Sequence, residues 1–359
     1  MRTARHTTPG SGLLWTIVAA VAVGLALLPL SGVGAAQQVK LTMFIWAGAN
    51  QGVVPREVVA AYLKTHPSVQ IEFWESNNTV TYPKMVAAKQ ANPSNPLINF
   101  GFFNVDATNR GDVDDMWVPL DPARIPNMAR VHKSLRRPDN RGIGYEMSAM
   151  GLMYNKDAVK DPPTSWTALW DPKWRGKVTF FDNNFIPLVL AARLNGGSEK
   201  NIDPGFRVWE QNAKNIRALV TSNDQLKNLI VSREALLGPW FTSIWKFWEE
   251  EGAPLGFANP KEGVVAFPLY LQIVKGSTPE QIHVAEQVIN ELLKPENNAR
   301  YARLTIGVPS EPEVRLSPGV EQILSPKLLD HAIWLDWATM GQKASEWRQR
   351  WEREVKSRL

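Results

Sequence analysis

Asp182 is the side chain whose position points most directly to binding chemistry. It follows Val178–Phe181, a short apolar run bounded by turn-forming residues, which predicts a buried strand. Strand ends commonly line clefts in open α/β sheets. A carboxylate at such an end can pair with a cation or accept hydrogen bonds from a ligand. An Asp at a strand end can also serve as a turn cap, and this alternative stays open.

The sequence carries no motif typical of a catalytic centre. It has no G-x-S-x-G elbow, no H-E-x-x-H pair, no P-loop and no cysteine, so these catalytic motifs and thiolate metal sites are excluded. The histidines are dispersed, and we expect them to be solvated; they are His6, His66, His132, His283 and His331. We therefore expect no catalytic residue, no metal and no cofactor. A Ser-His-acid set can still converge in three dimensions, so an enzyme remains the rival class.

The first elements after the N-terminal segment predict a β-α-β unit. Lys40–Trp46 is an extended apolar run, and Pro55 begins a helix whose apolar residues share one face. Val69, Ile71 and Phe73 then alternate with polar residues, as in a half-buried strand. Such a start implies parallel strand pairing and an α/β lobe.

Later segments show helical signals. Phe241–Trp248 has apolar residues at helical spacing, and Trp347–Val355 repeats every four residues. Thr278–Gln281 forms a capping box with Pro at the first helical position, and the helix that follows stops before Pro295. We predict a helix in each segment. Most of the 15 tryptophans are expected to fill cores.

The N-terminus resembles a secretory signal peptide. Arg2 and Arg5 form a basic region, Leu13–Leu30 is almost wholly apolar, and Ser31–Ala36 consists mostly of small residues. We expect cleavage near Ala36 and a periplasmic mature protein. An uncleaved membrane anchor is the alternative, because about eighteen apolar residues nearly span a bilayer.

Charge and length restrict the class of protein further. Removal of residues 1–36 takes away two arginines and no acid, which leaves 38 basic and 35 acidic residues, a net charge of +3. This balance is too weak to indicate binding of nucleic acid. The mature chain is longer than one core usually serves, so we expect two lobes in a monomer.

Gly151–Asp182 carries the strongest family resemblance. A G-x-x-Y-N strand precedes P-x-S-W-x-x-L-W-D-P-x-x-x-G-K-V in this segment. The pattern resembles the extracellular solute-binding proteins of ABC importers, and within them the cluster of spermidine/putrescine-binding and ferric-iron-binding proteins. Locally, Pro162 and Pro163 block a helix, and Ser165 can cap the short apolar turn that follows.

This resemblance implies a two-lobed α/β fold of the type II periplasmic binding proteins. Each lobe would be a mixed sheet flanked by helices, with a hinge and a cleft between the lobes. Residues 37–145 with about 271–307 would form the first lobe, and 146–270 with about 308–359 the second. The implied partners are a small organic ligand and an inner-membrane ABC permease.

The resemblance also transfers candidate ligand-binding residues. Six segments match strand ends and loops that line the cleft in the family. They are LTMFIW, WESNNT, GFFN, GKVTFFD, LLGPWFTS and KEGVVAFPLY. These segments provide Trp46, Asn77, Asn78, Asn104, Asp182, Trp240, Phe267 and Tyr270. The asparagines are also common loop formers, so a structural role is the alternative for each of them.

Departures from the family pattern bear on the ligand. Leu269 stands where the polyamine binders carry a second acid, and Asn183–Ile186 adds none. A polyamine needs several carboxylates, because a buried cation without a partner is costly. The six tyrosines are isolated and no histidines are paired, which disfavours iron. We expect a receptor for a small organic solute with at most one strongly cationic centre, polyamine-like or mono-amine; a ferric-iron receptor, a sensor receptor or a periplasmic enzyme are the alternatives.

Overall fold

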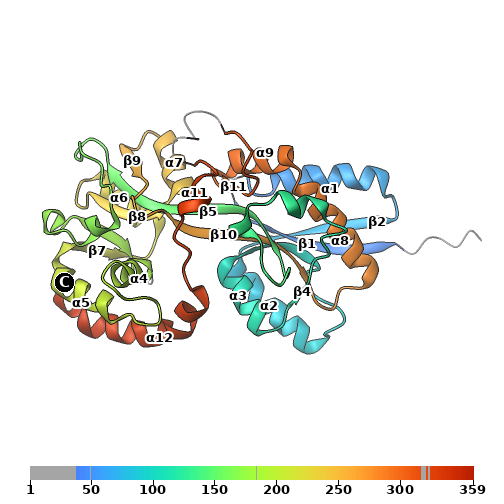
Figure 1. Cartoon of the computed structure of the whole chain (residues 1–359), viewed down its shortest axis with the longest axis horizontal. Coiled ribbons are helices and arrows are strands. Elements are labelled where there is room, and N and C mark those ends of the chain that lie inside the picture. Colours follow the sequence, from blue (N-terminus) through green and yellow to red (C-terminus); the bar gives the residue numbers. More distant parts are fainter. Residues whose placement is uncertain (1–37, 49, 183, 317–320, 322–323) are drawn as a thin grey trace, which may run out of the picture. The chain divides into compact units, whose positions relative to one another are not determined.

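The structure is a computed structural model, and it describes residues 38–48, 50–182, 184–316, 321 and 324–359. The predicted signal peptide lies outside these residues. The described strands form one mixed sheet (Figure 1). They are β1 (Val39–Trp46), β2 (Val69–Ser76), β3 (Phe100–Asn104), β4 (Trp117–Val118), β5 (Ile143–Asn155), β6 (Val178–Phe181), β7 (Ile216–Val220), β8 (Leu237–Phe241), β9 (Leu255–Ala258), β10 (Val265–Val274) and β11 (Val308–Pro309).

The main strand order is β2-β1-β3-β10-β5-β8-β6-β7. β1 runs parallel to β2 and β3, and β6 runs parallel to β7 and β8. The two long strands β5 and β10 pair with each other in antiparallel fashion at the middle of this order. The short strands β9 and β11 add to β5, and β4 adds to β10. The predicted α/β class and the parallel β1-α1-β2 start are confirmed.

Helices cover the sheet. The described helices are α1 (Val53–Thr65), α2 (Asn78–Ala91), α3 (Val105–Val113), α4 (Ile186–Arg193), α5 (Asp203–Asn212), α6 (Asn223–Val231), α7 (Thr242–Glu250), α8 (Pro279–Leu292), α9 (Pro295–Thr305), α11 (Leu328–His331) and α12 (Trp337–Glu354). α1 lies beside α8 and α9, α4 packs on α5, and α12 contacts both α3 and α5 (Figure 1).

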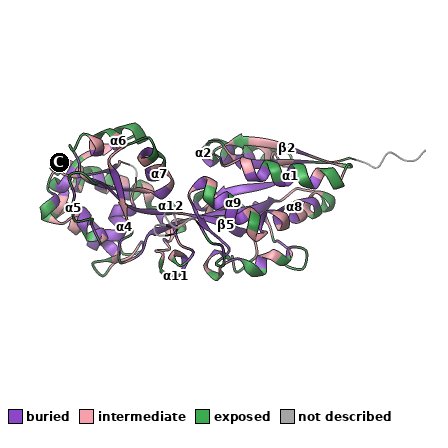
Figure 2. Ribbon diagram, turned by 90° about the horizontal axis from the view of Figure 1, so that it is seen from above, coloured by how far each residue is buried: buried purple, intermediate pink, exposed green. Residues whose placement is uncertain are grey.

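Two large hydrophobic clusters surround the sheet, and they divide along β5. Ala149 belongs to the first cluster, which joins β1, α1, α8 and α9. Met150, the next residue, belongs to the second, which joins β6, α4, α5 and α12. Figure 2 shows the buried β5 beneath helices whose outer faces are exposed. β5 and β10 thus contribute side chains to both cores.

Local sequence signals explain several element boundaries. Thr278 and Gln281 form the predicted capping box at the start of α8. The Ser165 side chain accepts a hydrogen bond from the Thr167 amide at a short 3-10 turn, as predicted. Trp347 and Trp351 are buried on one face of α12. One boundary was wrong: Phe241 ends β8 and precedes α7, because its backbone is extended.

Candidate functional site

A cavity of about 360 Å³ lies among the ends of β6 and β8, the start of α3 and the start of α12. Its walls are mostly aromatic and aliphatic. The residues that line it are Asp106, Met150, Phe181, Asn184, Phe185, Ile186, Trp240, Phe241, Phe267, Trp337, Met340, Gly341 and Ala344. Apolar concave sites with a few polar groups are typical of small-molecule binding.

The aromatic side chains in this cavity hold one another in place. The Trp240 and Phe181 rings are stacked, with centroids 4.2 Å apart and planes 7° from parallel. The Phe267 ring lies 4.6 Å from both Phe241 and Trp337, edge-on to the first and tilted against the second. Such pairs add about 0.5–1.5 kcal/mol beyond area burial. The rings of the walls are therefore held in place by contacts with one another.

Gly238 explains how Trp240 reaches Phe181. A Cβ atom at Gly238 would lie 2.2 Å from the carbonyl oxygen of Thr179, so only glycine lets β8 approach β6 this closely. Trp240 then stands two residues further along β8, opposite the end of β6. The position of Trp240 in the cavity wall thus depends on the close contact between Gly238 and Thr179, neither of which lines the cavity.

One polar atom in the cavity wall lacks a partner. The indole Nε1 of Trp240 is buried, and no acceptor lies within hydrogen-bond distance in the described part of the chain. A buried donor without an acceptor costs about 1–3 kcal/mol. Because this nitrogen is shielded from solvent, a solute in the cavity would meet the ring of Trp240 and not this donor.

Asp106 is the ionisable side chain among the described residues that line the cavity. It lies in the first turn of α3, after Asn104 caps that helix by accepting from the Ala107 amide at 2.9 Å. Its nearest cation is Arg110, at 3.8 Å. We did not predict Asp106, although an acid directly after a capping Asn at a strand end is a recognisable signal.

Asp182 lies outside the set of residues that line the cavity. It ends β6, and its amide donates to the carbonyl of Val220. Its Oδ2 pairs with Lys356 Nζ at 3.2 Å, and Lys356 also pairs with Glu352 at 2.9 Å. The other oxygen, Oδ1, is buried without a partner among the residues described. An internal ammonium group thus already occupies one side of this carboxylate.

The three predicted asparagines lie together but serve the backbone. Asn77 caps α2 by accepting from the Val80 amide at 2.9 Å. The Asn78 Oδ1 accepts from the Asn104 amide at 2.8 Å, and Asn104 in turn caps α3. None of them is among the cavity-lining residues, and the structural alternative accounts for their contacts.

Trp46 and Tyr270 also lie away from the cavity lining. The Trp46 Nε1 donates to the Phe102 carbonyl at 3.2 Å, which ties the end of β1 to β3. Tyr270 is buried in β10, with the Arg137 guanidinium 5.8 Å from its ring centroid. Burial raises the pKa of Tyr270 to about 12. Of the eight predicted residues, the cavity brings together Trp240 and Phe267.

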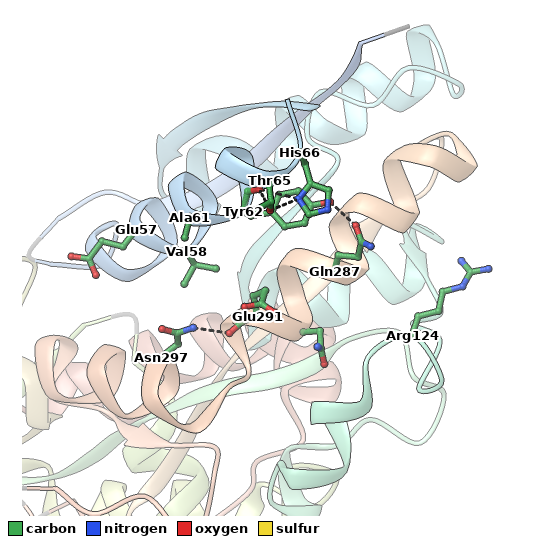
Figure 3. Close-up of a pocket in the computed structure, with 11 residues that line it drawn as sticks. Glu57, Val58, Ala61, Tyr62, Thr65, His66, Arg124, Gln287, Glu291 and Asn297 are labelled. Atoms are coloured by element: carbon green, nitrogen blue, oxygen red, sulfur yellow. Dashed lines mark hydrogen bonds between the residues drawn. The ribbon is translucent and has the colours of Figure 1, made fainter. Parts of the chain in front are cut away.

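A second cavity, of about 550 Å³, lies between α1 and α8 (Figure 3). Its polar groups bond to one another: the Tyr62 hydroxyl donates to Gln287, and the His66 ring stacks on Tyr62 at 3.9 Å. The Asn297 amide donates to the Glu291 carbonyl at 2.8 Å. Because these groups are already satisfied, this cavity is a weaker candidate than the aromatic one.

The described residues contain neither a metal-binding cluster nor a membrane-spanning helix. They contain no group of three or more His, Cys, Asp or Glu side chains placed to hold a metal ion. Within the same ranges, no helix is long and apolar enough to cross a membrane.

Residues 99–343 match the family model described as bacterial extracellular solute-binding protein. The spermidine/putrescine-binding periplasmic protein 1 of Haemophilus influenzae is 26% identical over 268 residues, 72% of each chain. A putative extracellular solute-binding protein from Bordetella parapertussis superposes with a TM-score of 0.76 at 16% identity, over 88% of this chain and 98% of that one. A Trichodesmium protein in complex with iron and citrate superposes with a TM-score of 0.69 at 14% identity, over 88% and 98%. These likenesses confirm the predicted fold, that of type II periplasmic binding proteins.

Proposed function

The chain belongs to the bacterial extracellular solute-binding proteins, and we propose that it is a periplasmic receptor that captures a small organic solute between two lobes and delivers it to an inner-membrane permease. Solute-binding proteins of this family serve ABC transporters. The observation that carries the proposal is the aromatic cavity, whose rings pack against one another.

The proposed lobes follow the predicted boundaries. Residues 37–145 with about 271–307 would form one lobe, and 146–270 with about 308–359 the other. The division of the two hydrophobic clusters at Ala149 and Met150 supports two lobes, but Val308, Leu324 and Leu329 pack in the first cluster, so the start of segment 308–359 packs with residues of the first lobe. Side chains on both sides of that division line the cavity: Asp106 lies in α3, after β3, and Trp240 lies near the end of β8. A solute held between them would favour a closed state by hinge motion.

The eight residues predicted from sequence divide into two groups under this proposal. Trp240 and Phe267 would contact the solute directly. Trp46, Asn77, Asn78 and Asn104 would support the loops beside the cleft. Asp182 and Tyr270 would have structural roles, Asp182 as the partner of Lys356 and Tyr270 as a buried residue of β10. Binding of a polyamine, as in the Haemophilus relative, is the second candidate, and the sequence identity to that relative favours it.

Trp240 provides the direct test of the site. A thermal-shift screen of the mature protein against amines, amino-acid derivatives, sugars and organic anions should identify a ligand, because binding raises apparent stability. Trp240→Phe keeps an aromatic ring in the wall, so affinity for that ligand should fall by less than about 5-fold, whereas Trp240→Ala removes the ring and should cost roughly 100-fold. Calorimetric titration measures both.

Trp170→Phe is the matched control, because Trp170 is a partly buried tryptophan that does not line the cavity. Its variant should bind the ligand as the natural protein does. Equal affinities for the natural protein and both Trp240 variants would remove the aromatic cavity as the binding site.

Export is expected to remove the N-terminal segment, which lies outside the described residues. The order of basic, apolar and small residues in 1–36 predicts a mature chain that begins at about residues 36–38. Intact-mass spectrometry of the protein recovered from a periplasmic fraction measures this directly. A chain that retains Met1 and sediments with membranes would contradict it.

A further inference from the structure

We infer that the aromatic cavity selects an organic monocation, with Asp106 as the residue that pairs with its charge. This inference rests on the proposed function and assigns a ligand class and a specificity-determining residue to the same site. The residue proposed to pair with a positive group of the ligand is therefore Asp106, and not Asp182 as predicted from the sequence.

The first argument is the charge of the lining. Among the described residues that line the cavity, Asp106 is ionisable, and none is a lysine or arginine. The Asp106 side chain is 63% exposed and lies in the first turn of α3, so its carboxylate is accessible. Its partner Arg110 stands 3.8 Å away and also covers the Tyr82 ring, with its guanidinium carbon 4.6 Å from the ring centroid. This long ion pair leaves the carboxylate free to meet a second cation.

The second argument is the aromatic walls. The faces and edges of Phe181, Phe185, Trp240, Phe241, Phe267 and Trp337 surround the space beside this carboxylate. Aromatic faces attract a cation through their quadrupole, most strongly when the cation has lost water. Arg348 already makes such a cation-π contact, with its guanidinium 5.5 Å from the Phe185 ring centroid. An organic cation is therefore favoured over an anion.

The third argument limits the number of charges. Asp182 holds Lys356, which also bonds to Glu352, so this carboxylate already has an ammonium partner from the chain itself. A second ammonium group of a polyamine would then be desolvated among aromatic rings without its own counter-charge, which is unfavourable. A single cationic centre matches the single carboxylate that lines the cavity.

Three probes test this inference by calorimetric titration of the mature protein. Choline is a monocation with an oxygen, 3,3-dimethylbutan-1-ol is its uncharged carbon isostere, and putrescine is a dication. We expect choline to bind at least about 10-fold more tightly than the isostere, and more tightly than putrescine. Asp106→Asn should weaken choline binding about 3- to 5-fold, as expected for a charge pair at an exposed carboxylate, and leave the isostere unchanged.

Two further variants separate the charge of Asp106 from its structural role. Asp106→Glu keeps the charge and should retain choline binding within about 2-fold, whereas a folding defect would appear in both Asp106 variants. Asp182→Asn is the matched control, and choline affinity should change by less than about 2-fold because Asp182 pairs with Lys356.

The outcomes distinguish the inference from the proposed function. An isostere that binds as tightly as choline, a choline affinity insensitive to Asp106→Asn, tighter binding of putrescine, or no binding of choline overturns the inference. If a neutral or anionic solute from the thermal-shift screen then binds, and its binding depends on Trp240, the proposed receptor function stands and the inference of a monocation alone fails. If the folded protein binds no solute in that screen, both fail.

Discussion

The Glu146→Gln variant should be more stable than the natural protein by about 2–3 kcal/mol at pH 8, and within about 1 kcal/mol of it at pH 5. Glu146 lies in β5, 3% exposed, opposite Leu269 of β10 and Pro309 of β11. Its carboxyl group accepts from the hydroxyls of Thr305 and Ser148, and no cation pairs with it among the described residues. Burial raises its pKa to about 7.

The sign of the pH effect follows from this raised pKa. The ordinary pKa of a Glu side chain is 4.5, so between about pH 4.5 and 7 the folded protein binds more protons at Glu146 than the unfolded chain does. Stability from this group is therefore full below about pH 4.5 and is lost as the pH rises to about 7. Glutamine removes the buried negative charge, keeps an acceptor for Thr305 and abolishes this loss.

Urea unfolding of both proteins at pH 5 and pH 8 measures the effect. Glu311→Gln is the control, because the Glu311 carboxylate is equally buried but pairs with Arg130 at 2.8 Å. That variant should lose stability at both pH values, the opposite sign. A Glu146→Gln protein less stable than the natural one at pH 8 would show that the carboxylate has a favourable partner and that the assigned pKa direction is wrong.

The fold was predictable wherever local signals and burial patterns agreed. The start at β1, the capping box of α8 and the buried tryptophan face of α12 follow from spacing alone. The pairing of β10 between β3 and β5 joins segments far apart in the sequence. Spacing contains no information on such pairings, and we did not predict them.

The candidate site was less predictable, because its residues converge from distant elements. Trp240 and Phe267 were identified by resemblance, and the cavity contains both. Asp182 was chosen as a strand-end acid, but its partner Lys356 lies 174 residues further along the chain. No local pattern reveals that pair. Asn77 and Asn104 show the reverse: their capping roles are local, and sequence chemistry predicts such roles well.

The Arg193→Ala variant should lose about 3 kcal/mol of stability. Arg193 forms two bonds to the Glu199 carboxylate, from Nη2 at 2.6 Å and from Nε at 3.0 Å, and also donates to the Trp334 carbonyl at 2.9 Å. Glu199 is only 4% exposed. Removal of the guanidinium would leave the Glu199 carboxylate buried. Among the described residues, its remaining hydrogen-bond donor would be the Asp336 amide, at 2.7 Å. Urea unfolding near pH 7 measures the loss.

A double variant and a control isolate the cause of this loss. Glu199→Gln in the Arg193→Ala background removes the unpaired charge, so it should restore more than half of the lost stability. Arg217→Ala breaks a pair with Glu234 in which both side chains are about half exposed, and it should cost less than about 1 kcal/mol. Equal losses for Arg193→Ala and Arg217→Ala would contradict the assigned role of burial.

The same contacts connect stability to the site. Glu199 and Arg193 bond to residues 334 and 336, directly before Trp337, which begins α12 and lines the aromatic cavity. Loss of these bonds frees the start of α12, and with it the ring that packs on Phe267 at 4.6 Å. Arg193→Ala should therefore weaken ligand binding several-fold at temperatures where the protein stays folded, whereas Arg217→Ala should not. Unchanged ligand affinity in the folded Arg193→Ala protein would show that Trp337 is held by its ring contacts alone.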